Sequence, residues 1–272
     1  MKAEHSDSRL SLSIELVDDR FVPAPTEDQR NLVLERVANE AVAELVHLDG
    51  IAGDFVPNIP SSPYTQDWAD APAVYTESEL LIDGHQVMQE WEAPLMKAMV
   101  ERTAATHGDV LEIGFGMGIS ASYFQELGVR SHTIVEVNEG VIAEFERWRA
   151  GYPDRDIRLI RGLWQDTVNQ LGEYDGVLYD PYPTSDDEGD FPGGSSINED
   201  PFYAVAAGVL RPTGVFSHYT DEIDSLSRPH QRFLLDHFDR VEVALVRGLA
   251  PPPGCRYFWS DTMVVVSATH PR

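Results

Sequence analysis

Three glycines at alternate positions end an apolar run near the middle of the chain. Gly114, Gly116 and Gly118 follow the segment Asp109-Val-Leu-Glu-Ile113. Glycine has no Cβ atom, so this loop can turn tightly and let its backbone touch a ligand. The next apolar run ends in Glu136, where an acid can bind ribose hydroxyls. The pattern predicts a nucleotide-like cofactor at the ends of two parallel strands; a tight turn without a ligand is the alternative.

The spacing of the loop separates one cofactor class from another. It is Gly-x-Gly-x-Gly, whereas dinucleotide-binding proteins use Gly-x-Gly-x-x-Gly. Glu112, two residues before the first glycine, would repel a pyrophosphate and attract a cation. We therefore expect S-adenosylmethionine (SAM), with Glu112 near its amine or sulfonium and Glu136 at its ribose. A dinucleotide oxidoreductase is disfavoured.

A second group of reactive residues, Tyr179-Asp180-Pro-Tyr182, ends the fourth apolar run of this region. Ligands of open α/β sheets bind at the carboxyl ends of strands. Proline makes the turn after Asp180 rigid, and Tyr179 and Tyr182 can enclose an amine. An acidic turn with packed tyrosines is the alternative interpretation.

Two further acids, Glu90 and Glu92, flank Trp91 before the glycine loop. Helical neighbours at i and i+2 face apart, so at most one of the two points inward. The sequence contains no His-Glu-x-x-His or Cys-x-x-Cys motif, and its 9 histidines are scattered. We therefore expect no metal site.

These residues need strands and helices to position them, and the hydrophobic pattern from about residue 65 onwards supplies both. Alternation of the two kinds of element predicts a mostly parallel sheet covered on both faces, with an antiparallel pair at the end. The expected strands are 110–113, 133–137, 157–160, 176–180, 214–219, 241–246 and 262–268. The expected helices are 86–106 (bent or divided by Pro94), 119–127, 140–149, 165–171, 198–210 and 229–238.

Residues 1–64 read as an N-terminal extension. Residues 10–16 alternate as in a half-buried strand, and residues 26–48 carry an apolar stripe at helical spacing. A Pro- and Gly-rich linker follows at 51–64. The broad stripe needs a cover, so we expect it to pack on a second subunit, in a homodimer, or to close over the site.

Composition restricts the partners. The 272 residues carry 46 acids against 20 bases, a net charge of −26, which disfavours nucleic acid and anionic membranes and favours a cationic substrate. A solvated acidic surface without a partner explains the same charge. No apolar run is long enough to span a membrane, the N-terminus lacks a signal peptide's apolar stretch, and Cys255 is the only cysteine. We expect a cytoplasmic setting.

Seven ordered segments of the chain resemble guanidinoacetate N-methyltransferase, a class I SAM-dependent family, over roughly residues 65–270. They are Trp68-x-x-Ala71-Pro-Ala-x-Tyr75, Val87-Met88-x-x-Trp91-Glu92-x-Pro94-x-Met96, Val110-Leu-Glu-Ile-Gly-Phe-Gly-Met117, Ile134-Val-Glu136-x-Asn138-x-Gly-Val141, Gly162-Leu163-Trp164-x-Asp166, Leu178-Tyr-Asp180-x-Tyr182-Pro183 and Cys255-Arg-Tyr-Phe258.

The resemblance implies an α/β, Rossmann-like methyltransferase domain over residues 65–272, with a mostly parallel seven-stranded sheet and an antiparallel last strand. It implies SAM as the cofactor, S-adenosylhomocysteine as the product, and no metal. The implied catalytic pair is Asp180 and Glu92, which also bind the guanidine, with Tyr182 and Trp68 beside it. The implied cofactor residues are Glu112, Gly114, Gly116, Gly118, Glu136, Leu163, Trp164, Tyr75 and Met88.

One departure from the resembled family bears on the substrate. That family holds the substrate carboxylate with an Asn-Leu-Thr-Ser-type segment after the fifth strand, and this chain has Ser217-His-Tyr-Thr-Asp-Glu-Ile-Asp224 there. Asp221 and Glu222 would suit an ammonium group. We therefore place free L-arginine, or an arginine-derived small molecule, ahead of guanidinoacetate. Acids that simply face solvent are the alternative.

The expected reaction is methyl transfer from SAM to a guanidino nitrogen. Paired carboxylates can hold a guanidinium by charge-assisted hydrogen bonds, and Asp180 can accept its proton. Other interpretations stay open: a non-catalytic SAM-binding regulator, an amine methyltransferase with a non-guanidino substrate, or a nucleic-acid amine methyltransferase, which the charge disfavours.

Overall fold

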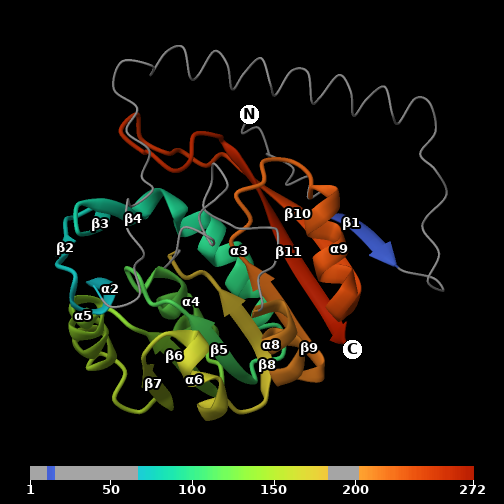
Figure 1. Cartoon of the computed structure of the whole chain (residues 1–272), viewed down its shortest axis with the longest axis horizontal. Coiled ribbons are helices and arrows are strands. Elements are labelled where there is room, and N and C mark those ends of the chain that lie inside the picture. Colours follow the sequence, from blue (N-terminus) through green and yellow to red (C-terminus); the bar gives the residue numbers. More distant parts are fainter. Residues whose placement is uncertain (1–10, 16–66, 183–201) are drawn as a thin grey trace, which may run out of the picture. The chain divides into compact units, whose positions relative to one another are not determined.

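A computed structural model describes residues 11–15, 67–182 and 202–272 of the chain. The helix expected at 26–48 and the linker at 51–64 lie outside these residues, as do the proposed subunit contact and the first residues of the helix expected at 198–210. All described residues belong to one compact unit. Its centre is an eight-stranded sheet in the order β1-β10-β11-β9-β8-β5-β6-β7 (Figure 1).

Five neighbouring strands of this sheet are parallel: β9 (Leu210–His218), β8 (Tyr174–Tyr179), β5 (Asp109–Ile113), β6 (Ser131–Glu136) and β7 (Ile157–Arg161). Strand β11 (Thr262–Pro271) lies between β9 and β10 (Phe238–Arg247), antiparallel to both. The predicted mostly parallel sheet with an antiparallel last strand is confirmed. Strand β1 (Ser11–Glu15) pairs with β10 and adds an eighth strand that we had assigned to the extension.

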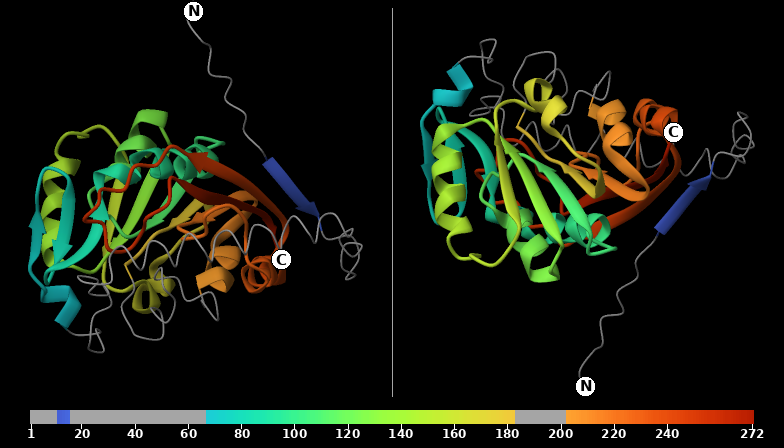
Figure 2. Two further views of the ribbon diagram at one scale, coloured as in Figure 1. Left: turned by 90° about the horizontal axis from the view of Figure 1, so that it is seen from above. Right: turned by 90° about the horizontal axis from the view of Figure 1, so that it is seen from below.

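Helices cover both faces of the sheet because the strands are apolar on both sides. On one face α3 (Ala93–Thr103), α4 (Ile119–Leu127) and α5 (Glu139–Arg149) pack with Val110 and Val265. On the other, α6 (Trp164–Thr167), α8 (Phe202–Val209) and α9 (Arg228–His237) pack with Leu111 and Val264. Figure 2 shows α4 on one side of the sheet and α6, α8 and α9 on the other. The 3-10 helix η2 (Val168–Gln170) follows α6, so the helix expected at 165–171 is split.

The helix predicted at 86–106 is wrong in its first part. Residues His85–Gln89 form strand β4, Glu90–Glu92 form the 3-10 helix η1, and the α-helix begins only at Ala93. Pro94 lies in the first turn of α3, where its missing N–H costs nothing, so it starts the helix and does not bend it.

Strand β4 belongs to a small second sheet, in the order β2 (Ala73–Tyr75), β3 (Glu79–Ile82), β4. Asp83 and Gly84, both with positive φ (49° and 79°), make the two-residue turn between β3 and β4. An Asp-Gly pair suits such a hairpin turn because both positions need a left-handed backbone. Leu80, Ile82 and Met88 are buried in the core that also contains α3, so the hairpin is fixed to the main unit.

Candidate active site

The glycine loop connects β5 to α4 and lies against two other segments. At Gly114 (φ 88°) a Cβ atom would lie 2.7 Å from the backbone oxygen of Asp180, and at Gly116 (φ 54°) it would lie 2.7 Å from Met88 Sδ. The positive φ favours glycine at both positions, and at Gly114 the close approach of a backbone oxygen also requires it. Gly118 precedes the first turn of α4 as its N-cap. The loop therefore contacts both the segment that follows β8 and strand β4 of the small sheet.

Glu136 ends β6 with its carboxylate held next to this loop. Oε2 accepts a hydrogen bond from Phe115 N (2.9 Å), and Oε1 accepts from Val137 N (2.8 Å) and Asn138 N (2.9 Å). Burial raises the pKa of Glu136, and these backbone donors oppose that shift. The acid is thus oriented before any ligand arrives, as a group that binds ribose hydroxyls needs to be.

Residues of the segment 68–88 contact the glycine loop directly. The Tyr75 hydroxyl donates to Gly116 O (2.9 Å), and Met88 Sδ accepts from Met117 N (3.3 Å). Asn138, the buried N-cap of α5, donates from Nδ2 to Trp68 O (2.8 Å) and Ala71 O (2.9 Å). The structure therefore brings Tyr75 and Met88 together with the loop and Glu136.

The carboxylates expected to catalyse form a second cluster, composed of Glu92, Asp180 and Asp221. Glu92 is 3% exposed, and burial raises its pKa to about 7. Asp180 follows β8, with its backbone N donating to Ile113 O (3.1 Å). Burial raises the pKa of Asp180 well above its usual value, and the negative charges of Glu92 and Asp221 raise it further. Two acids thus oppose the ionisation of Asp180, and a cationic ligand would relieve that repulsion.

Asp221 and Glu222 are neighbours in sequence but have different surroundings. Asp221 has a left-handed backbone (φ 54°), and its negative charge raises the pKa of Asp180. Glu222 Oε1 accepts from Ser227 N (2.8 Å), and its Oε2 lies 3.2 Å from His230 Nδ1. Glu222 therefore belongs with a buried histidine pair, in which the Nε2 atoms of His218 and His230 are 2.6 Å apart. The structure separates it from the carboxylate cluster.

The carboxylate oxygens of Glu112 also contact other side chains of the protein. It is 1% exposed; its Oε1 accepts from Ser120 Oγ, and its Oε2 lies 2.9 Å from His132 Nε2. The His132 Nδ1 atom in turn lies 3.1 Å from Gln125 Nε2. This network ties β5 and β6 to α4. The charge of Glu112 still raises the pKa of Asp180, so its effect on the site is electrostatic.

The aromatic residues expected at the site make two separate sets of ring contacts. Trp68 stacks on Tyr182 with ring centroids 4.9 Å apart and planes 7° apart. Trp164 is buried and meets Phe202 edge-on at 5.0 Å, while Leu163 is the half-buried N-cap residue of α6. Trp68 and Trp164 are thus both buried core residues, and Tyr182, two residues after Asp180, packs on Trp68.

Two tyrosines next to the carboxylate cluster, Tyr257 and Tyr219, were not predicted from the sequence. Tyr257 donates from its hydroxyl to Glu92 Oε1 (2.6 Å), and the pKa of Tyr219 is raised by burial and by the charges of Glu92 and Asp221. The segment Cys255-Arg-Tyr-Phe258 had signalled a shared motif without a role. Tyr219 lies two residues before Asp221 in sequence and could have been included on that ground.

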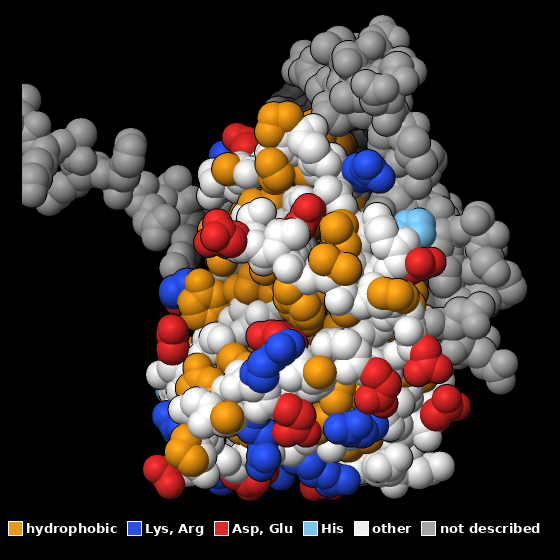
Figure 3. Space-filling model, turned by 90° about the vertical axis from the view of Figure 1, so that its left-hand side faces the viewer, with side chains coloured by type: hydrophobic (Ala, Val, Ile, Leu, Met, Phe, Trp, Pro, Cys, Tyr) orange, Lys and Arg blue, Asp and Glu red, His pale blue; other side chains and the backbone are white. Residues whose placement is uncertain are grey.

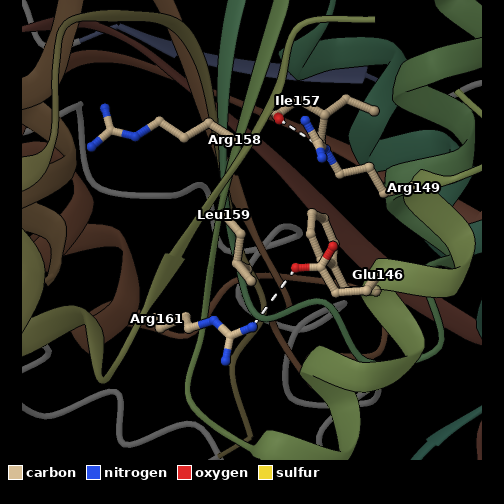
Figure 4. Close-up of a pocket in the computed structure, with 7 residues that line it drawn as sticks. Glu146, Arg149, Ile157, Arg158, Leu159 and Arg161 are labelled. Atoms are coloured by element: carbon tan, nitrogen blue, oxygen red, sulfur yellow. Dashed lines mark hydrogen bonds and ion pairs between the residues drawn. The ribbon is translucent and has the colours of Figure 1, made fainter. Parts of the chain in front are cut away.

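A separate hollow of about 390 Å³ lies between α5 and β7 (Figure 4). Its charged groups contact the protein: Arg149 Nε donates to Ile157 O (3.2 Å), and Arg161 lies 3.7 Å from Glu146. Figure 4 also shows Arg158 pointing away from Glu146. On the face that carries β2 and α5, acidic and basic side chains alternate (Figure 3). None of the hollow's lining residues belongs to the candidate site.

Within the described residues, no group of three or more His, Cys, Asp or Glu side chains could hold a metal ion. The helices of the same residues include none with the length and apolar character that a membrane crossing needs.

The parallel sheet with its inserted antiparallel strand, the glycine loop and the acid at the end of β6 define a class I SAM-dependent methyltransferase fold. Two solved spermidine synthases share this fold over 73% of this chain: one bound to the analogue AdoDATO (TM-score 0.54, 17% identity, 73% of that chain) and one from Thermotoga maritima (TM-score 0.52, 17% identity, 72% of that chain). At this identity the likeness shows the fold alone.

The family model for guanidinoacetate N-methyltransferase matches residues 59–221, and the chain belongs to that family. Among similar curated proteins are two named protein arginine N-methyltransferase 2. The Candida glabrata protein is 31% identical over 160 residues, which cover 53% of this chain and 35% of that protein. The Saccharomyces cerevisiae protein is 32% identical over 145 residues, covering 49% and 32%. The chain thus spans about a third of the length of these relatives.

The glycine loop and Glu136 fit SAM, the cofactor of this family. The backbone of the glycine loop can approach a ligand closely because Gly114 and Gly116 carry no Cβ atom. Glu136 presents an oriented carboxylate beside that loop.

Proposed function

We propose that this protein transfers a methyl group from SAM to a guanidino nitrogen of arginine or of an arginine-derived small molecule. The observation that carries the proposal is the cluster of Glu92, Asp180 and Asp221, in which the negative charges of Glu92 and Asp221 oppose the ionisation of the buried Asp180. A cation is the ligand that such a cluster favours, and a guanidinium can bind two carboxylates at once. Family membership supports guanidino chemistry.

SAM, when bound, supplies an activated methyl group. We assign Glu136 and the backbone of Gly114, Gly116 and Gly118 to binding SAM. Tyr75 and Met88, from strands β2 and β4 of the small sheet, would support the loop through their contacts with it. Leu163, half-buried at the start of α6, remains our candidate for the adenine contact. Trp164 is buried in the core and would act by supporting that position.

The chain's acids perform the remaining steps. A guanidinium is protonated at any ordinary pH, so its nitrogen has no free lone pair for attack. Asp180 aligns the reacting nitrogen and takes its proton on a carboxylate oxygen as the new bond forms. Its raised pKa makes it a stronger base than an ordinary aspartate. Glu92 neutralises and orients the other side of the guanidinium, and alignment supplies a large part of the rate.

Asp221 extends the same cluster and bears on the choice of substrate. An acid and an ammonium about 4 Å apart attract by roughly 1–4 kcal/mol at surface-like dielectric, which is enough for a tenfold preference. We therefore favour L-arginine over guanidinoacetate, whose far end is an anion. Because the curated relatives are named for protein arginine, arginine within a polypeptide is the second candidate substrate.

A competition experiment at limiting SAM tests the proposal. L-arginine, guanidinoacetate and a blocked arginine dipeptide are mixed in equal amounts, and the products are separated and weighed by mass spectrometry. Methyl-arginine as the main product supports the proposal. Methylated dipeptide as the main product would show that the preferred substrate is arginine within a polypeptide. Methylated guanidinoacetate as the main product would show that Asp221 carries no specificity. Binding of SAM without any methylated guanidine would favour a regulator or a non-guanidino amine substrate.

A further inference from the structure

The loop between β10 and β11, residues 248–261, extends back to the segment that carries Glu92. Gln86 on β4 binds this loop twice: its Oε1 accepts from Arg256 N (2.9 Å), and its Nε2 donates to Gly254 O (3.1 Å). Phe258 is buried and stacks on Trp91 with centroids 5.4 Å apart. The loop is therefore fixed to β4 and η1 on both sides of Tyr257.

Tyr257 uses this fixed position to contact Glu92. Its hydroxyl donates to Glu92 Oε1 at 2.6 Å, and Gln89 N donates to the same oxygen at 2.7 Å. Within the described part of the chain, both donors meet Oε1, which leaves Oε2 as the oxygen that can face a substrate. Burial and the charge of Glu92 raise the pKa of Tyr257, so the phenol stays protonated and remains a donor.

The same contact acts on the ionisation of Glu92. Burial raises the pKa of this carboxyl to about 7, and the hydrogen bonds from Tyr257 and Gln89 hold it lower than burial alone would. A hydrogen bond to a charged acceptor is stronger than one between neutral groups, so its loss should be felt mainly by the ionised form.

We propose that Tyr257 is a positioning residue for guanidine binding, which occupies Oε1 of Glu92, aims Oε2 at the substrate and favours the carboxylate over the neutral acid. The inference rests on the proposed function, since it assigns Glu92 to the guanidinium. It adds a residue from the far end of the chain, 165 positions from Glu92, to the machinery of the site.

Tyr257→Phe tests the proposal because it keeps the ring against Trp91 and removes only the donor. We expect the KM for the guanidine to rise about tenfold at neutral pH, the scale of a hydrogen bond to a charged group. The acid limb of kcat/KM should move up by about one pH unit, so that activity recovers at higher pH. The Kd for SAM should not change. Tyr152→Phe, three residues after the end of α5, is the matched control and should behave as the parent protein.

A direct titration separates this inference from the proposed function. The carboxyl signal of Glu92, assigned in protein labelled at glutamate with carbon-13 by its loss in Glu92→Gln, is followed against pH in the substrate-free protein with and without Tyr257→Phe. A raised pKa in the variant supports the link even if the parent protein methylates no guanidine. An unchanged pKa and an unchanged pH profile would overturn it, as would an activity loss equal at every pH with an unchanged KM, which would mean that Tyr257 only supports the loop.

Discussion

Glu92→Gln should make the substrate-free protein more stable at alkaline pH while it impairs catalysis. A glutamine amide oxygen can accept the same two hydrogen bonds, from Gln89 N and the Tyr257 hydroxyl, that Glu92 Oε1 accepts now. The variant therefore keeps the packing of a side chain that is 3% exposed and removes only its ability to ionise. Stability and turnover should change in opposite directions because the charge serves the substrate and not the fold.

The size of the effect follows from the pKa of Glu92, which burial raises from 4.5 to about 7. The folded protein keeps the proton up to about pH 7, whereas the unfolded chain releases it near 4.5. Stability is therefore lost as pH rises through this window, and the loss is complete above pH 7. At about 1.4 kcal/mol for each pH unit, the ionised Glu92 costs about 3 kcal/mol of unfolding free energy. Removing its charge also relieves Asp180, which adds to the gain in the same direction.

Urea unfolding of both proteins at several pH values measures this difference. The stability of Glu92→Gln relative to the parent should grow between pH 4.5 and 7 and then level off. Effects of the net charge of −26 cancel, because they are common to both proteins. Glu90→Gln is the control: Glu90 lies in the same 3-10 helix but is exposed, and its difference should stay flat. A flat difference for Glu92→Gln as well would refute the reasoning.

Three further predictions concern the cofactor, the substrate and the fold. Glu136→Ala should weaken SAM binding strongly in calorimetry; unchanged affinity would remove Glu136 from the ribose role. Asp221→Asn should shift the arginine-to-guanidinoacetate preference by about tenfold toward guanidinoacetate, and a constant ratio would mean that this acid does not meet the substrate. Burial and His230 lower the pKa of His218 well below 6.5, so its stability contribution is full above pH 6.5 and lost below it as the unfolded chain takes up the proton. His218→Gln should therefore lose less stability than the parent between pH 7.5 and 5.5, by up to about 1.4 kcal/mol per pH unit, and parallel curves would contradict this.

The order of strands and helices could be predicted because each strand is a short apolar run bounded by turn residues. The prediction failed at His85–Gln89, where five residues are too few to show whether the period is helical or extended. The Asp83-Gly84 pair was the available signal for a hairpin and was not used. The edge strand β1 was expected as a strand, but its partner β10 is more than 200 positions away, and sequence periodicity does not reveal pairing at that separation.

The candidate site shows the same limit more sharply. Residue type and spacing selected Asp180 and Glu136, the resemblance to the family selected Glu92, and the structure supplies their surroundings. Spacing also selected Glu112, but its carboxylate oxygens contact Ser120 and His132. The sequence does not show whether the side chain of an acid before a glycine loop points toward the ligand or into the protein. Tyr257 was missed because its contact with Glu92 depends on the path of the chain between them.

Methyl transfer from labelled SAM to L-arginine, compared between the parent protein and Asp180→Asn, tests the central claim most directly. Asparagine keeps the shape of Asp180 and removes the proton acceptor. The parent should yield methyl-arginine of the expected mass, and the variant should lose at least about 100-fold in turnover while its affinity for SAM is kept. Normal turnover by Asp180→Asn, or a parent protein that binds SAM and methylates no guanidine, would contradict the account.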